Sequence, residues 1–176
     1  MNNPTTGVIE CVFNLVVDYT QCPEERIKTG GCDEVYNSAL FCDAIRTYPP
    51  DEKNQIRRKR SFAVFHFKRK IRSDEAIKRM EKRGYRPATL LELLAASKTK
   101  RNLHQKLSMI ALIALTPFFG HDALGDCVPV IVKHSRGRES DNCFSVNNKK
   151  KNKRELSYRG LKPGWSKNAR FLAVKE

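Results

Sequence analysis

The stretch from Ser73 to Ser97 constrains the fold of this chain more than any other part of the sequence. It reads S-D-E-A-I-K-R-M-E-K-R-G-Y-R-P-A-T-L-L-E-L-L-A-A-S. Its apolar spacing predicts two helices, at about 73–83 and 90–97. Pro87 keeps the residue before it extended, so the two helices cannot fuse into one. The apolar side of each helix needs a surface to pack on, and we expect that surface to be a sheet.

The ends of both predicted helices carry local signals. Ser73 is a good N-cap residue, and Gly84 suits the left-handed position that follows a helix. Thr89 and Glu92 have the spacing of a capping box at the start of the second helix. That helix is apolar nearly all round, so we expect it to be buried. A buried helix cannot read DNA bases, so we interpret the pair as a scaffold and not as a helix-turn-helix motif.

Strand signals stand on both sides of this scaffold. The predicted strands are rich in β-branched and aromatic residues and span about 8–19, 61–68, 109–115, 127–133, 143–146, 156–158 and 170–175. Both faces of 61–68 are apolar, which is typical of a central strand. Pro129 cannot donate a backbone hydrogen bond, so we expect the strand 127–133 at an edge. The sequence therefore predicts an α+β fold, with two packed helices against a largely antiparallel sheet.

The segments between these strands predict smaller elements. A short helix is expected over 23–29, and another within 33–45. Residues 120–126 and 147–154 have the composition of loops, and the second of these is too polar to bury. We expect the large ring of Trp165 to be an anchor in the core.

Basic charge is concentrated in the larger, C-terminal part of the chain. The whole sequence has 34 basic and 19 acidic residues, a net charge of +15. Residues 1–56 hold four basic and nine acidic side chains, a balance of −5, so residues 57–176 carry +20. We therefore expect an acidic N-terminal segment, 1–56, that packs on a basic α+β core domain, 57–176. The basic part attracts polyanions, with nucleic acid first among them, and docking of the acidic segment accounts for the same asymmetry.

Short runs of lysine and arginine are the candidate contacts for a polyanion, although such runs also occur as solvated surface. The candidate anion- or nucleic-acid-binding residues are Arg57, Arg58, Lys59, Arg60, Lys68, Arg69, Lys70, Lys78, Arg79, Lys82, Arg83, Lys98, Lys100, Arg101, Lys149, Lys150, Lys151, Lys153 and Arg154. The residues to which we assign a structural role are Ser73, Gly84, Pro87, Thr89, Glu92 and Trp165.

The sequence lacks the motifs of an enzyme or a metal site. It has no G-x-S-x-G motif, no glycine-rich phosphate loop and no two cysteines separated by two residues. His121 and Asp122 are the most catalytic-looking pair, but adjacent side chains usually diverge, and an ordinary loop accounts for them. His66 is more typical of a hydrogen-bonded core histidine than of a ligand or base. We assign no catalytic residue, metal or cofactor.

The location of the protein is predicted from two absences in the sequence. No run approaches the roughly 20 apolar residues that cross a bilayer, and the first residues lack the basic region of a secretory signal. We therefore expect a cytoplasmic protein that does not bind membranes and whose six cysteines are reduced.

Six segments of the chain match a family pattern. They are V-D-Y at 17–19, E-E-R-I-K-T-G-G at 24–31, F-H-F at 65–67, S-D-E-A-I-K-R-M-E-K-R-G-Y-R-P-A-T-L-L-E-L-L-A at 73–95, I-A-L at 110–112 and R-F-L-A-V-K at 170–175. With these segments the chain resembles an uncharacterised family of small proteins from candidate-phylum bacteria. The family's usual glycine after the A-L strand is Ile113 here. This resemblance implies no activity.

A second resemblance lies within the same stretch. The block G-Y-R-P-A-T-x-x-E-L at 84–93 is similar to the glycine–arginine–proline–threonine block of C-type-lectin-like domains of the sulfatase-modifying-factor kind. Arg170 and Phe171, before the last strand, are similar to the C-terminal motif of those domains. The resemblance implies that the block is structural and that loops in the later half bind ligands. The catalytic cysteines of that family have no counterpart here, so no enzymatic activity is implied.

Two hypotheses follow for the function. The first is a non-enzymatic module that binds an anionic partner, RNA or DNA before others, through the basic runs. The alternative is a lectin-like domain that presents the loops between 116 and 168 to a protein or small ligand. Both are compatible with the same fold, because a fold does not determine a function.

Overall fold

The structure of the chain is a computed structural model. The residues described are 7–36, 41–42, 57–103, 111–114, 119–121, 125–133, 153–161 and 164–176. The predicted strand 143–146 and the candidate residues Lys149, Lys150 and Lys151 lie outside them.

The described part of the chain contains three helices and nine strands. The helices are α1 (Pro23–Thr29), α3 (Ser73–Glu81) and α4 (Leu90–Thr99). The strands are β1 (Val8–Asp18), β2 (Glu34–Val35), β3 (Arg57–His66), β4 (Tyr85–Pro87), β5 (Ala111–Ile113), β6 (Phe119–His121), β7 (Gly125–Lys133), β8 (Arg154–Gly160) and β9 (Ala169–Lys175).

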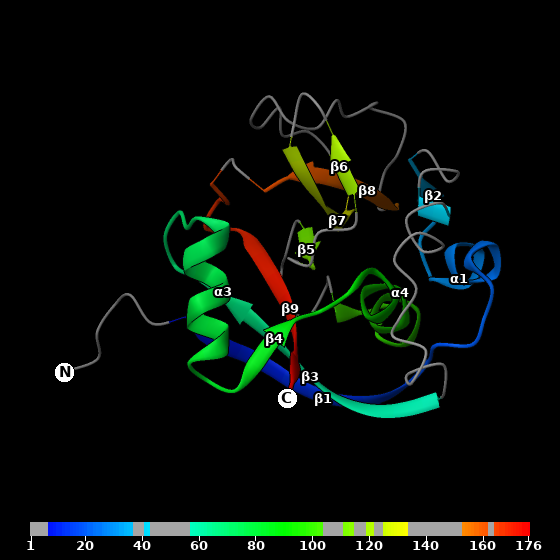
Figure 1. Ribbon diagram of the computed structural model, residues 1–176, viewed down its shortest axis with the longest axis horizontal. Coiled ribbons are helices and arrows are strands. Elements are labelled where there is room, and N and C mark those ends of the chain that lie inside the picture. Colours follow the sequence, from blue (N-terminus) through cyan, green and yellow to red (C-terminus); the bar gives the residue numbers. More distant parts are fainter. Residues whose placement is uncertain are drawn as a thin grey trace.

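Within the described residues all nine strands join one sheet, in the order β1-β3-β9-β5-β7-β8-β2, with β4 on β9 and β6 on β7 (Figure 1). Six of the eight strand pairings are antiparallel, and β5–β9 and β2–β8 are parallel. The predicted α+β class with a largely antiparallel sheet is confirmed. The acidic segment supplies β1 and β2, the first and last strands in this order, and so it forms part of the sheet.

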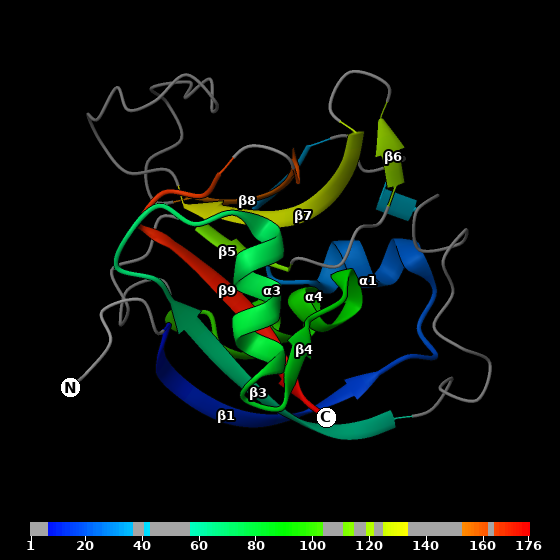
Figure 2. The same cartoon turned by 60° about the vertical axis from the view of Figure 1, so that its left-hand side comes forward.

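The helices lie on opposite faces of this sheet (Figure 2). Ala76 and Met80 of α3 pack on one face, with alternate residues of β3 and β9 such as Phe65 and Phe171. α4 and α1 pack on the other face, against a core that includes Phe62. Both predicted helices therefore pack against the sheet, as expected, but on different faces of it.

The physical reason lies in the link between α3 and α4. Gly84 has a φ of +74°, the left-handed conformation expected after a helix. Tyr85, Arg86 and Pro87 then form β4, which pairs with the C-terminal half of β9. Because β4 lies at the side of β9, the chain passes from one face of the sheet to the other before α4 begins.

The start of α4 agrees with the sequence signals, and the start of α3 does not. The Thr89 side chain accepts from the Glu92 N–H, and the Glu92 carboxylate accepts from the Thr89 N–H, which completes the capping box. The N-cap residue of α3 is Arg72 and not Ser73, and Arg72 makes no side-chain cap hydrogen bond. The Ser73 Oγ donates to the Leu161 carbonyl at 2.8 Å and accepts from the indole Nε1 of Trp165 at 2.7 Å. Ser73 therefore holds a distant, buried tryptophan instead of capping its own helix.

Pro129 lies in an interior strand, because β7 pairs with β8 on one side and with β5 and β6 on the other. The Ala114 N–H donates to the Pro129 carbonyl, on the side of β5 and β6. The ring nitrogen of Pro129 is directed to the same side, where it falls in the gap between these two short strands. Pro129 faces no residue of the described β5 and β6 ladders, so its missing N–H interrupts neither of them, and the predicted edge position is wrong.

Two shorter predictions also change. Glu34 and Val35, inside the predicted helix 33–45, form β2 and pair with β8. Phe119–His121 form β6, in a region that overlaps the predicted loop 120–126. Both strands are short and depend on a partner far away in the sequence, and for that reason no local pattern indicates them.

Candidate anion-binding site

The predicted basic residues do not form one surface. On the face of α3, in or beside that helix, lie Lys68, Arg69, Lys70, Lys78, Arg79, Lys82 and Arg83. On the opposite face, at the C-terminal end of α4, lie Lys98, Lys100 and Arg101. The two sets are separated by the sheet.

Carboxylates neutralise much of the charge on the α3 face. Glu75 accepts hydrogen bonds from Arg79 and, at 3.4 Å, from Arg69. The Arg72 guanidinium lies 3.3 Å from Asp74. Lys78, Lys82 and Arg83 are exposed and make no ion pair within the described residues, but they line neither of the two clefts described below.

The run from Arg57 to Arg60 forms the first part of β3 and is not a loop. Its residues alternate between exposed and half-buried, as the period of a strand requires. Arg57 is exposed, and its Nε donates to Asp18 of β1 at 2.7 Å. Arg58 and Arg60 point to the half-buried side, so these four cations do not act together on one partner.

A groove of about 600 Å³ lies between β1 and the end of α4. One wall is formed by Cys11, Val12 and Phe13 of β1, and the other by Lys98 to Leu103. The Lys100 ammonium lies 5.6 Å from the centre of the Phe13 ring, within the range of a cation–π contact. The Arg101 guanidinium lies 3.8 Å from Asp33 and remains largely exposed.

Lys153 and Arg154 are held by the N-terminal segment. The Lys153 ammonium donates to Glu34 at 2.9 Å. Arg154 begins β8 and is only 6% exposed. Its guanidinium donates to the carbonyls of Ser97 and Gly31 and lies near Asp33. The prediction of Arg154 as part of an exposed basic loop is wrong, because this side chain ties the loop after α1 to the end of α4.

Glu92 is a buried carboxylate with a structural role. It is fully buried, and it accepts from Arg86 at 2.6 and 2.9 Å and from the Tyr19 hydroxyl at 2.8 Å. Burial by itself raises the pKa of Glu92, but the hydrogen bonds and charge of Arg86, with the Thr89 N–H, bring this pKa below its ordinary value. The carboxylate is therefore ionised and saturated, which is the arrangement of a structural group.

The described residues contain no arrangement typical of catalysis or of a metal site. Within that part of the chain no three metal-ligating side chains converge. Both ring nitrogens of His66 have partners, the Glu10 carboxylate and the Lys167 carbonyl, each at 2.8 Å. Burial raises the pKa of the Cys32 thiol to about 11, so it is protonated near neutral pH. His66 is half-buried and hydrogen-bonded, as expected.

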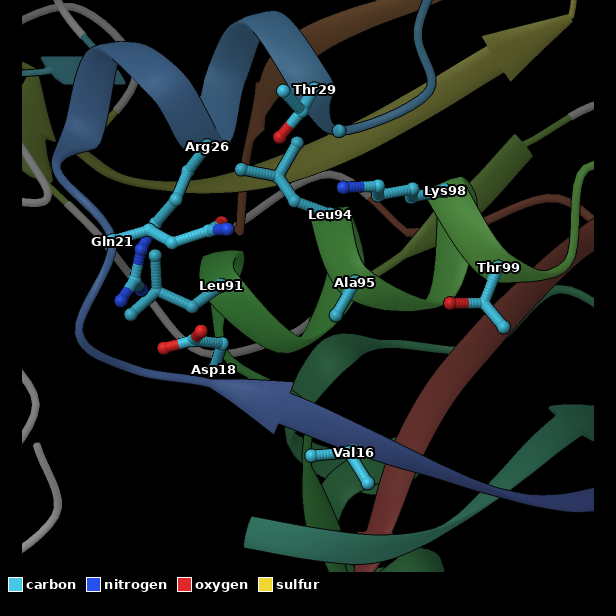
Figure 3. A pocket seen from close by; sticks show the side chains of 11 residues that line it. Val16, Asp18, Gln21, Arg26, Thr29, Leu91, Leu94, Ala95, Lys98 and Thr99 are labelled. Carbon is cyan, nitrogen blue, oxygen red and sulfur yellow. The ribbon is translucent and has the colours of Figure 1, made fainter. Parts of the chain in front are cut away.

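A second cleft, of about 200 Å³, lies between α1, α4 and the end of β1 (Figure 3). Its polar lining includes Asp18, Gln21, Arg26, Thr29 and Lys98. Sequence reasoning predicted Lys98 but missed Arg26. Arg26 belongs to the E-E-R-I-K-T-G-G segment of the family resemblance, but that resemblance implies no role for it. Its burial depends on α4, so the sequence does not distinguish it from a solvated arginine.

Comparison of this chain with models of known protein families, with curated proteins and with solved structures finds no match. Among the described residues, no helix combines the length and apolar character required to span a membrane.

Proposed function

We propose that this protein is a non-enzymatic module that binds an anionic partner, RNA or DNA before others, in the groove between β1 and the end of α4. The observation that carries the proposal is the chemistry of the two walls. Lys98, Lys100 and Arg101 supply three positive charges on one wall, and apolar side chains of β1 supply the other. Single-stranded nucleic acid presents phosphates and base faces side by side, which suits a groove with one cationic and one apolar wall.

Helix stability accounts for part of this pattern. Lysines near a helix C-terminus interact favourably with the helix dipole, and Lys98 and Lys100 have that position in α4. The dipole does not account for the groove, for the exposure of Arg101 or for the apolar wall opposite. These features favour a ligand over a purely structural role.

The chain contains its own matched control for the test. Lys82 and Arg83 follow α3 as Lys100 and Arg101 follow α4, and they line neither cleft. The double variants Lys100→Ala/Arg101→Ala and Lys82→Ala/Arg83→Ala remove the same charge from the protein. Binding of a fluorescein-labelled 20-nucleotide RNA or DNA single strand would be followed by anisotropy between 50 and 200 mM salt.

We expect the Lys100/Arg101 variant to bind about tenfold more weakly than the wild type at about 100 mM salt. Its slope of log K against log salt should fall by about 1.4, because two phosphate contacts are lost. The Lys82/Arg83 variant should retain the slope. An equal loss of affinity in both variants would show that net charge alone drives binding, and it would contradict a site in the groove. A wild type that binds neither the RNA nor the DNA strand would also contradict it.

The lectin-like arrangement is a second proposal, and it concerns the later loops. It is supported by the segment 84–93, which forms a left-handed helix end, a short strand and a capped helix, the structural role that the resemblance implies. The loops between 116 and 168 lie largely outside the described residues. A ligand that binds equally well to the wild type and to the Lys100/Arg101 variant would favour these loops over the groove.

A further inference from the structure

The cleft between α1 and α4 contains a buried positive charge with no ion-pair partner among the described residues. Arg26 is only 6% exposed, and its Nε and one terminal nitrogen are buried without a hydrogen-bond partner in that part of the chain. An unpaired charge inside a protein is costly, because the water that it loses is not replaced. Burial also lowers the pKa of this guanidinium from its ordinary value. The charge of Asp18 offsets part of this cost, but burial is the larger effect.

The other buried arginines of the described residues show how this chain usually treats such a group. Arg154 donates to the carbonyls of Ser97 and Gly31 and to the Ser97 hydroxyl. Arg170 donates to the Glu10 carboxylate at 2.6 Å and to two backbone carbonyls. Both guanidinium groups are tied by several acceptors. Arg26 differs from them in that it lines an open cleft, where an acceptor can come from outside.

Asp18, a carboxylate that lines the same cleft, is already occupied. One oxygen of Asp18 accepts from the N–H and the hydroxyl of Thr20, at 2.9 and 2.6 Å, and the other accepts from Arg57 at 2.7 Å. These hydrogen bonds lower the pKa of Asp18 to about 2, so it stays ionised and paired with Arg57 at neutral pH. Two cations of the cleft, Arg26 and Lys98, remain without an ion pair in the described part of the chain.

The remaining polar groups of the cleft are suited to an anion. In Figure 3 the Gln21 amide and the Lys98 ammonium point toward each other across the cleft, while the Arg26 side chain runs down from α1 toward Leu91 and Asp18. Thr29 adds a hydroxyl to the lining. A guanidinium binds two oxygens of a phosphate at once, and an ammonium adds a point charge. Two positive charges match a phosphate monoester, which carries nearly two negative charges, better than a single carboxylate.

We propose that the α1–α4 cleft binds one phosphate monoester group, with Arg26 and Lys98 as its cationic contacts and Gln21 and Thr29 as neutral donors. The group belongs either to a small phosphorylated molecule or to the terminal phosphate of a nucleic acid strand. Lys98 and Thr99 line both this cleft and the larger groove, so a strand in the groove could end here. The cleft does not need the groove, and it can bind free phosphate by itself.

The first test is thermal unfolding of the full chain, followed by the fluorescence of Trp165, in sodium chloride, sodium acetate or sodium phosphate of equal ionic strength. At 100 times its Kd, phosphate should raise the Tm of the wild type by about 5–10 °C, and acetate of equal ionic strength should raise it less. The Arg26→Met variant should lose this response. In chloride it should melt about 2–4 °C higher than the wild type, because an unpaired buried charge has been removed. A structural arginine would instead lower the Tm when it is replaced.

Two further variants keep the test decisive if Arg26→Met does not fold. Lys98→Ala changes an exposed residue and should weaken phosphate binding about tenfold with little change of Tm in chloride. Lys28→Ala, on α1 but outside the cleft, should respond to phosphate as the wild type does. A wild type that responds to phosphate no more than to chloride overturns the proposal. So does a Lys98→Ala variant with the full response.

The source of the phosphate is determined with two oligonucleotides. Tighter binding of a 5′-phosphorylated strand than of its 5′-hydroxyl counterpart supports a strand terminus in the cleft. Equal binding of the two strands, with free phosphate still bound, supports a small phosphorylated ligand. The Lys100→Ala/Arg101→Ala variant should keep its phosphate response, so the groove can fail its test while the cleft passes.

Discussion

The two long helices of this protein end alike in sequence and differently in structure. Lys82 and Arg83 follow α3, and Lys100 and Arg101 follow α4. The first pair lies on a face where Glu75 and Asp74 neutralise neighbouring arginines, and it borders neither cleft. The second pair lines a groove and lies beside an aromatic ring. Two neighbouring basic residues are therefore a candidate binding site when they line a concave surface, and their charge alone does not make them one.

The same two helices also carry one arginine–glutamate cluster each, and burial separates them. Glu92 is fully buried beside Arg86, whereas the side chain of Glu75 is 40% exposed beside Arg69 and Arg79. Ion pairs at the surface contribute little to stability, and breaking a buried pair is costly because it leaves a charge without a partner. Substitutions in the two clusters should therefore differ strongly.

The largest effect is expected for Glu92→Gln. We expect this variant to lose about 3 kcal/mol of unfolding free energy, near the lower limit for a broken buried pair, because Arg86 is about one-third exposed. Urea unfolding at pH 7 measures the loss. A change below about 1 kcal/mol would mean that the buried cluster resembles the exposed one, and the comparison would fail.

The pH dependence of the same cluster gives an independent check. The pKa of Glu92 is lower in the folded protein than its usual value of 4.5, so the unfolded chain binds a proton more readily. The stabilisation is therefore complete above about pH 4.5 and is lost as the pH falls through the folded pKa. We expect the stability difference between wild type and Glu92→Gln to shrink below pH 4.5. A difference that stays constant down to pH 3 would contradict an ionised Glu92.

An intermediate effect is expected for Ser73→Ala, at the start of α3. The substitution leaves the buried indole N–H of Trp165 without an acceptor, which should cost about 1–2 kcal/mol. Trp165 is the single tryptophan of the chain, so its fluorescence reports directly on this site. An unchanged emission spectrum with the same loss of stability would instead point to a lost helix cap.

The smallest effect is expected for Glu75→Gln on the exposed face. Its loss of stability should stay below about 1 kcal/mol. The variant releases Arg69 and Arg79 from their carboxylate, so the α3 face should attract a labelled oligonucleotide about twofold more strongly at low salt. Anisotropy measures this gain, and the groove variant Lys100→Ala/Arg101→Ala should show the same gain if the two faces act independently. If the oligonucleotide affinity rises in Glu75→Gln by as much as it falls in the groove variant, the α3 face and the groove contribute equally to binding.

The features that the sequence predicted are those with local causes. The capping box of Thr89 and Glu92 involves residues three positions apart, and the left-handed Gly84 is a property of one residue. Ser73 has the same local signal as a cap, but its hydroxyl binds groups 88 and 92 residues away. A distant partner competes with the local one and leaves no trace in the surrounding sequence.

The candidate site was less predictable than the fold for the same reason. Lys98, Lys100 and Arg101 could be proposed from the density of charge, but the wall opposite them comes from β1, far away in the chain. Arg26 and Arg154 are both buried arginines, and the sequence distinguishes neither from a solvated one. Only the packed structure shows that Arg154 is held by carbonyls, whereas two nitrogens of Arg26 have no acceptor among the described residues.

The position of β9 has a consequence for the synthesis of the protein. This strand, the last in the described order of the chain, lies between β3 on one side and β4 and β5 on the other. A growing chain therefore cannot assemble its sheet until residues 169–175 have left the ribosome. Until then the central strands expose unpaired edges, which are sites of aggregation. Assembly of this sheet must therefore wait for β9, and its neighbours β3 and β5 are expected to need protection from aggregation until β9 has been made.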